Sequence, residues 1–175
     1  MGNEQSSSVQ VSSNMELIGD GQSSRDSIYS MLLNIKGFQD FEQAELMYLV
    51  QHMKAYRVRA GATIFREGEN NSYLGMLIKG RVSVHKEDSN NDDKLLTVIS
   101  PGRIFGEISV IDDLPYSASL IAETDATIVL MSRESFRQCI DERSVIGVRL
   151  LNLIARLLCA RLRSASGQLV EYIDV

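Results

Sequence analysis

The chain is poor in the residues that build crosslinks, metal centres and fibrous structures. Its 175 residues include two cysteines, two histidines, two prolines and no tryptophan. Two cysteines provide no disulfide framework, and two histidines do not favour a histidine-rich metal site. Twelve scattered glycines exclude a collagen-like repeat. We therefore expect neither a resident metal nor a cofactor.

An excess of positive charge and a long apolar run are missing as well. Lysine and arginine total 18 against 23 acidic residues, which gives a net charge of −5. An acidic chain has no general attraction for nucleic acid. The longest strongly apolar stretch, residues 145–162, is interrupted by Arg149, Asn152, Arg156 and Arg161, so no membrane span is predicted. No signal peptide is visible, and we expect a cytoplasmic protein.

What is present is the composition of one globular domain, 44% hydrophobic and 23% charged. Residues 1–25 differ, because serine, asparagine, glutamine and glycine dominate them, and they predict a flexible tail. The first six residues, Met1 to Ser6, fit the pattern for N-myristoylation. That pattern is short, so an ordinary start remains the alternative. Residues 26–175 form the predicted domain.

Hydrophobic periodicity predicts a mainly β fold with flanking helices. A helix should begin near Asp26, and a second should cover about 41–53 with Asp40 as its cap. Period-two runs then predict strands over 56–58, 63–65, 74–78, 82–85, 95–99, 119–122 and 127–131. Helical spacing returns over 133–140 and from about 145 to as far as 172. Many short strands between turn residues indicate an antiparallel barrel or sandwich.

The segment from Pro101 to Ala122 carries the most chemistry. Gly106 and Glu107 open it, and a short helical turn beginning at Glu107 would present free backbone N–H groups, which favour an anion such as phosphate. A glutamate beside them suits a neutral vicinal hydroxyl, because a carboxylate accepts from O–H without competing for the anion. The pairing predicts a sugar phosphate as ligand.

These residues resemble the cyclic-nucleotide-binding domain family. The likeness covers about residues 35–165 and rests on Phe65-x-x-Gly68, Leu77-Ile78-x-Gly80-x-Val82-x-Val84, Pro101-Gly102-x-x-Phe105-Gly106-Glu107 and Pro115-x-x-Ala118. It implies an antiparallel double-stranded β-helix (jelly-roll) barrel with short N-terminal helices and a long C-terminal helix. It also implies that residues 105–118, here called the cassette, bind cyclic AMP or cyclic GMP.

Residue roles follow from that resemblance. Glu107 would hold the ribose 2′-hydroxyl, and Gly106, Ile108 and Ser109 would give backbone contacts to ribose or phosphate. Ser117 would contact the cyclic phosphate. The remaining cassette positions carried over as ligand contacts are Phe105, Pro115, Tyr116 and Ala118.

One position departs from the family pattern, because its phosphate-binding arginine falls on Tyr116. A phenol cannot replace the charged planar fork of a guanidinium, and the loss predicts affinity lower by about one to two decades. Three interpretations remain: weak cyclic nucleotide binding, a different ligand, or a fold without a small-molecule ligand. Arg103, which replaces the usual acid after the Pro-Gly turn, is either surface charge or a compensating cation.

The long C-terminal helix has a broader apolar arc than one packing face needs. Leu150, Leu153 and Leu157 mark one seam, and Leu151, Ile154, Leu158 and Leu162 mark a second. One seam should cover the barrel and the other should be buried in a parallel homodimer, over about residues 145–172. The resemblance makes Leu162, Ala165 and Ser166 the residues that cover the base. Arg149, Arg156 and Arg163, spaced by seven, are a solvated face or a site for an acidic partner.

The sequence thus predicts a stand-alone regulatory domain, and not an enzyme. No activated nucleophile or metal cluster is apparent, and no residues follow the long helix to build a DNA-binding domain, so we expect no direct DNA binding. The expected partners are a cyclic nucleotide, a second copy of the chain and an unidentified protein. The alternative is a degenerate, ligand-free fold that acts as a dimeric interaction module.

Overall fold

The structure is a computed structural model that describes residues 14–70 and 72–173. Its strands are β1 (Met15–Asp20), β2 (Met53–Val58), β3 (Thr63–Phe65), β4 (Tyr73–Lys79), β5 (Val82–Glu87), β6 (Asp93–Ile99), β7 (Ile104–Phe105), β8 (Ser119–Ala122) and β9 (Ala126–Ser132). Its helices are α1 (Arg25–Leu32), the 3-10 turn η1 (Phe38–Asp40), α2 (Gln43–Val50), α3 (Glu107–Asp112), α4 (Arg133–Glu142) and α5 (Ser144–Ile173).

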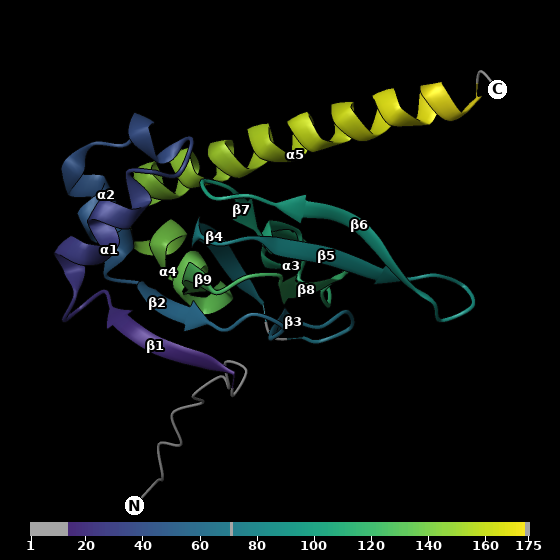
Figure 1. Cartoon of the computed structure of the whole chain (residues 1–175). Coiled ribbons are helices and arrows are strands. Elements are labelled where there is room, and N and C mark those ends of the chain that lie inside the picture. The colour runs from purple at the N-terminus through teal and green to yellow at the C-terminus, as the bar shows by residue number, and fades with distance from the viewer. Residues whose placement is uncertain (1–13, 71, 174–175) are drawn as a thin grey trace, which may run out of the picture.

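The strands form two antiparallel sheets that face each other. The first has the order β1-β2-β9-β4-β7 and the second β3-β8-β5-β6. Helices α1, α2 and α4 and the start of α5 gather at one end of the molecule, while the β5–β6 hairpin projects at the other (Figure 1). This mainly β arrangement with flanking helices confirms the predicted fold class.

The central strands β9 and β4 of the five-stranded sheet are buried on both faces, which explains why they are almost continuously apolar. In β9, Ile128 and Leu130 face the second sheet, whereas Val129 and Met131 face the helices. Alternate residues of a strand point to opposite faces, so one strand serves two cores. The core between the sheets contains the cassette residues Phe105 and Tyr116, and the core under the helices contains the apolar faces of α1 and α2.

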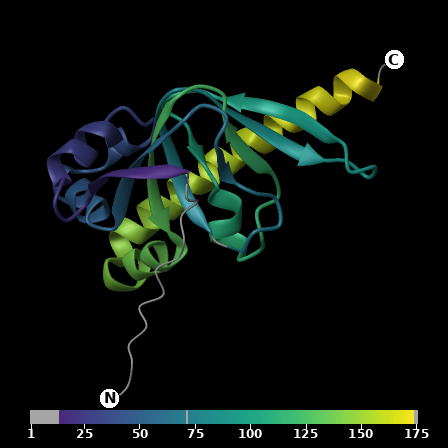
Figure 2. The same cartoon turned by 60° about the horizontal axis from the view of Figure 1, so that its bottom comes forward.

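Helix α5 connects the helical end of the molecule to the sheets. Its 30 residues reach about 45 Å at 1.5 Å per residue. Its first half packs through Ile146, Leu150 and Ile154 against the helical core, and its second half extends beyond it along the strands (Figure 2). Among the described residues, no helix combines the length and apolar character needed to cross a membrane.

The structure differs from the predicted element boundaries in several places. The tail was expected to reach residue 25, but residues 15–20 form β1, which pairs with β2 from Met15–Val58 to Asp20–Lys54. Only one of the six residues of β1 is buried, so the strand depends on backbone pairing and leaves no hydrophobic alternation in the sequence. The remaining tail, residues 1–13 with the myristoylation pattern, lies outside the described residues.

The second predicted helix is also too long, and one strand was not anticipated. Helix α2 ends at Val50, since Met53 already belongs to β2, and its N-terminus is held by a capping box of Glu42 and Glu45 instead of Asp40. The two-residue strand β7, which precedes Gly106, is too short to give a periodic signal.

Candidate functional site

A cavity of about 110 Å³ lies between the cassette, strand β5 and helix α5. Its lining is mostly apolar, with one carboxylate, two serines and one guanidinium among the polar groups. The residues that line it are Val84, Ile99, Phe105, Gly106, Glu107, Ile108, Ser109, Tyr116, Ser117, Ala118, Leu120 and Arg161. Segments far apart in the sequence therefore meet at one concave site, which is typical of ligand pockets.

Gly106 makes the chain turn sharply into α3 at the edge of this cavity. Its φ of 73° lies in the left-handed region, and a Cβ there would approach the carbonyl oxygen of Tyr73 to 2.3 Å. Only glycine satisfies both conditions without strain. The turn places Glu107 as the first residue of α3, with its side chain directed inward and 1% exposed.

Glu107 is held by a cation from the far end of the chain. Arg161 on α5 donates through Nη1 to Glu107 Oε1 and through Nη2 to the carbonyl oxygen of Ile104 at 2.7 Å. The Arg161 side chain is 43% exposed, so the ion pair bridges solvent and the buried carboxylate. Within the described residues, the second oxygen, Glu107 Oε2, is buried and has no hydrogen-bond partner. An unsatisfied buried acceptor is costly, and one beside a cavity marks a place for a donor from a ligand or water.

Tyr116 occupies the opposite part of the lining and behaves as a core residue. Its ring stacks on Phe65 with centroids 4.3 Å apart and planes 8° apart. Its hydroxyl oxygen accepts from the backbone N–H of Tyr73 at 2.8 Å. The side chain is 4% exposed, and burial raises the pKa of the phenol, so it stays neutral. Tyr116 brings no charge to the cavity.

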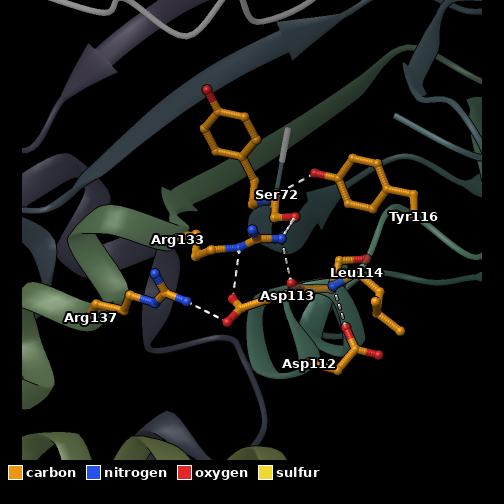
Figure 3. A network of polar contacts seen from close by, with 9 residues as sticks. Ser72, Asp112, Asp113, Leu114, Tyr116, Arg133 and Arg137 are labelled. Carbon is orange, nitrogen blue, oxygen red and sulfur yellow. Dashed lines mark hydrogen bonds and ion pairs between the residues drawn. The ribbon is translucent and has the colours of Figure 1, made fainter. Parts of the chain in front are cut away.

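A polar network fixes the other side of α3 to α4 (Figure 3). Arg133 donates through Nη2 to Ser72 Oγ and to the carbonyl oxygen of Ser109, the latter at 2.7 Å. Its Nε lies 3.4 Å from Asp113 Oδ1, and Arg137 pairs with the same carboxylate. Since Glu107 and Ser109 both belong to α3, this short helix is bound to α5 on one side and to α4 on the other.

The structure brings most of the predicted site residues to this cavity. Eight cassette positions line it: Phe105, Gly106, Glu107, Ile108, Ser109, Tyr116, Ser117 and Ala118. Pro115 is exposed at its edge and is not part of the lining, and Arg103 is likewise exposed and does not line it. The contacts of these residues with a ligand remain predictions.

The α5 residues that were expected to cover the nucleotide base do not line the cavity. Leu162 is 68% exposed, and Ala165 and Ser166 are exposed as well. None of the three lines the cavity, which receives Arg161 instead. Because each helical residue is rotated by about 100° from the previous one, a helix that presents Arg161 turns Leu162 and Ser166 away.

Four lining residues were not identified from the sequence, and Arg161 is the charged one; the other three are Val84, Ile99 and Leu120. Arg161 was noted as a cation that interrupts an apolar stretch, and that interruption is the one local signal for it. The contact to Glu107 spans 54 residues, so no spacing rule could have paired the two.

The apolar seams of α5 also differ in detail from the prediction. Ile154 of the second seam is buried in the helical core together with Leu150 of the first, so the two seams do not separate into one inner and one outer face. Leu153 and Leu157 are partly buried beside them, as are Leu151 and Leu158. Val148 and Leu162 remain exposed, at 55% and 68%.

A comparison with protein families matches residues 56–143, just over half of the chain, to the cyclic nucleotide-binding domain. The matched segment contains the whole cassette, the strands around it and α4. The chain belongs to the cyclic nucleotide-binding domain family. The family resemblance inferred from the cassette motifs is thereby confirmed.

Individual relatives of this cyclic nucleotide-binding domain include bacterial regulators. The CRP-like cAMP-activated global transcriptional regulator of Mycobacterium tuberculosis is 31% identical over 136 residues, which are 78% of this chain and 59% of that protein. The cyclic AMP receptor protein of Thermus thermophilus is 29% identical, over 62% of this chain and 49% of that protein. The chain thus spans about half to three fifths of the length of these relatives.

A solved structure supports the fold over nearly the whole chain. The cyclic nucleotide-binding domain from Methylobacillus flagellatus superposes with a TM-score of 0.78 and 28% identity, and the match covers 89% of this chain and 87% of that one. The similarity therefore includes the flanking helices as well as the sheets.

Proposed function

We propose that this cyclic nucleotide-binding domain is a regulatory sensor that binds cyclic AMP or cyclic GMP weakly and signals through α5. The observation that carries the proposal is Glu107 Oε2, a buried acceptor beside the cavity that has no partner among the described residues. In a 3′,5′-cyclic nucleotide the 2′-hydroxyl is the one free ribose hydroxyl, and it is a neutral donor of the kind this oxygen needs.

The weak affinity follows from Tyr116. The phosphate end of the pocket, meaning Tyr116 and Ser117, has a neutral phenol at the position where the family pattern has arginine. A hydrogen bond to a charged group contributes about 1.5–3 kcal/mol, so its absence lowers affinity by about one to two decades.

Signalling through α5 is supported by the contact between Arg161 and Glu107. The cavity of about 110 Å³ is smaller than the roughly 300–1,000 Å³ of typical ligand sites. A nucleotide that reaches Glu107 must therefore shift Arg161, and with it the second half of α5. The ligand would then favour one of two positions of the helix, as a population shift requires.

We propose that α5 also forms a parallel homodimer. Exposed Val148 and Leu162 are fourteen residues apart in the chain, and half-buried Leu151 and Leu158 follow the same seven-residue spacing. Exposed Cys159 lies beside this seam and offers a test without any substitution. A parallel dimer predicts a disulfide-linked species under mild oxidation and a dimer mass in sedimentation. A monomer at tens of micromolar would exclude this interface.

Thermal-melt titration with cyclic AMP and cyclic GMP, up to millimolar, tests the sensor function, with 5′-AMP as control ligand. A ligand at 100 times its dissociation constant stabilises by about 2.7 kcal/mol, which raises the melting temperature of a domain this size by about 5–10 °C. The shift should vanish in Glu107→Ala and persist in Glu87→Ala, which removes an exposed glutamate at the hairpin end of β5.

The alternative is a ligand-free interaction module, and the burial of Tyr116 in the core favours it. Absence of any shift at millimolar nucleotide, in the native chain and in Tyr116→Arg alike, would support that function over the sensor. A gain of binding in Tyr116→Arg alone would indicate a complete pocket that lacks its phosphate contact.

A further inference from the structure

The charge of the pocket is already balanced before any ligand enters. Among the described residues that line the cavity, Glu107 is the one acid and Arg161 the one base, and they are paired with each other. Arg161 also donates to the carbonyl oxygen of Ile104, so one N–H on each Nη atom is engaged. A monoanionic ligand would add a negative charge, and the one cation among the described lining residues, Arg161, is already paired with Glu107.

Two further cations that contact the cassette, Lys86 and Arg133, are also engaged in ion pairs. Lys86 Nζ lies 2.8 Å from Glu67 Oε1 and donates to the carbonyl oxygen of Ser117 at 2.7 Å. Arg133 contacts Ser109 from behind α3, but it is paired with Asp113. Moving either cation toward a phosphate would break an ion pair and free a carbonyl oxygen from its donor, which is an additional cost.

Tyr116 is fixed in its place and cannot turn to meet a phosphate cheaply. Its backbone N–H donates to the carbonyl oxygen of Glu69, and its carbonyl oxygen accepts from the N–H of Gly68. Its hydroxyl oxygen and ring are held by Tyr73 and Phe65. A rotation of the side chain would break the stack and leave the buried N–H of Tyr73 without its acceptor.

The polar atom of the lining that has no partner among the described residues is, by contrast, an acceptor, which suits a neutral donor. Glu107 Oε2 requires a hydroxyl, and a ribonucleoside supplies its 2′-hydroxyl without a charge. From this balance we infer that the pocket prefers a ribonucleoside to the corresponding 3′,5′-cyclic nucleotide, with Tyr116 as the residue that selects against the phosphate. The inference rests on the proposed function only in that Glu107 binds a ribose hydroxyl.

Calorimetric titration of the native chain tests the preference directly. The ligands are adenosine and guanosine, each compared with its 3′,5′-cyclic monophosphate and with its 2′-deoxynucleoside. At least one ribonucleoside should bind about tenfold or more tightly than its cyclic nucleotide, since an unpaired charge costs more than one ordinary hydrogen bond returns. The 2′-deoxynucleoside should lose about tenfold in affinity, because Glu107 then lacks its donor.

Two variants at one position separate charge from packing. Tyr116→Arg should reverse the order, so that the cyclic nucleotide binds more tightly than the nucleoside. Tyr116→Phe removes the hydroxyl but adds no charge and keeps the ring, and it should leave the order unchanged. If Tyr116→Arg does not fold, the affinities of the native chain and of Tyr116→Phe for the nucleoside and the cyclic nucleotide still decide whether the nucleoside is preferred.

The outcomes distinguish this inference from the proposed function. Tighter binding of the cyclic nucleotide by the native chain would overturn the nucleoside preference and leave the cyclic nucleotide sensor intact. No binding of either class by the native chain at millimolar concentration would overturn both. Tighter nucleoside binding that does not depend on the 2′-hydroxyl would overturn the role of Glu107 and, with it, this inference.

Discussion

The two ends of the pocket differ in how completely their polar groups are paired. At the Glu107 side, called here the hydroxyl end after the ribose hydroxyl that it is proposed to bind, the buried carboxylate pairs with the partly exposed Arg161, and its second oxygen has no partner among the described residues. At the phosphate end, Tyr116 is stacked on Phe65 and bound to Tyr73, and it belongs to the core between the sheets. One end remains polar at a cost in stability, while the other contributes to stability and has lost the charge that the family pattern carries.

The difference shows how the same cassette serves two purposes. A polar group that is buried and incompletely paired costs free energy, which a donor from a ligand or a water would recover. A buried aromatic residue with a satisfied hydroxyl has no such cost. We therefore expect substitutions at the phosphate end to affect folding first, and substitutions at the hydroxyl end to affect both folding and ligand binding.

The largest effect should come from deleting the aromatic ring at the phosphate end. Tyr116→Ala removes a side chain that is 4% exposed and opens a cavity beside Phe65. Large-to-small substitutions of buried aromatic residues cost about 3–5 kcal/mol. Urea unfolding should show a loss in that range. A loss below about 1 kcal/mol would mean that Tyr116 is not part of the core.

The next effect should come from breaking the ion pair at the hydroxyl end. Arg161→Ala leaves Glu107 buried without its cation, and such losses reach about 3–5 kcal/mol for fully buried pairs. Because Arg161 is 43% exposed, we expect about 1–3 kcal/mol in urea unfolding. Arg163→Ala, at an exposed position two residues further along α5, is the matched control and should change stability by less than about 0.5 kcal/mol. Equal effects of the two variants would contradict the pairing.

A smaller effect should follow from removing one oxygen atom at the phosphate end. Tyr116→Phe keeps the stack on Phe65 but leaves the N–H of Tyr73 without its acceptor at 2.8 Å. An unsatisfied buried donor costs about 1–3 kcal/mol, and we expect the lower part of this range because the ring is retained. Tyr29→Phe in α1 controls for the general effect of losing a phenol. Identical unfolding midpoints for Tyr116→Phe and the native chain would show that the hydrogen bond contributes nothing.

The smallest effect concerns alkaline pH. Burial raises the pKa of Tyr116 above its ordinary value of about 10. The folded state therefore retains a proton that the unfolded state loses. The contribution of Tyr116 to the free energy of unfolding is complete below pH 10 and falls above it. At pH 10.5 the loss is about 0.8 kcal/mol. The free energy of unfolding should fall between pH 8 and pH 10.5 in both proteins. The fall should be about 0.8 kcal/mol larger in the native chain than in Tyr116→Phe. The same loss in both proteins would contradict the shift.

Much of the fold was predictable because it depends on patterns that repeat along the chain. Strands β3 and β8 occur at the predicted residues, and α3 begins at Glu107 as the cassette indicated. The failures have a common cause. Strand β1 and the two residues of β7 are held mainly by backbone pairing to strands far away in sequence, so no side-chain pattern predicts them.

The sequence by itself determined the family, the position of the cassette and the replacement of its arginine by Tyr116, because these depend on residue identity and local spacing. Only the tertiary structure decided what those residues do. It placed Arg161 on Glu107 across 54 residues, and it turned Tyr116 into the core against Phe65. The physical reason is that a charge pair or an aromatic stack requires a particular distance and orientation, and these arise only when the helix and the sheets pack together.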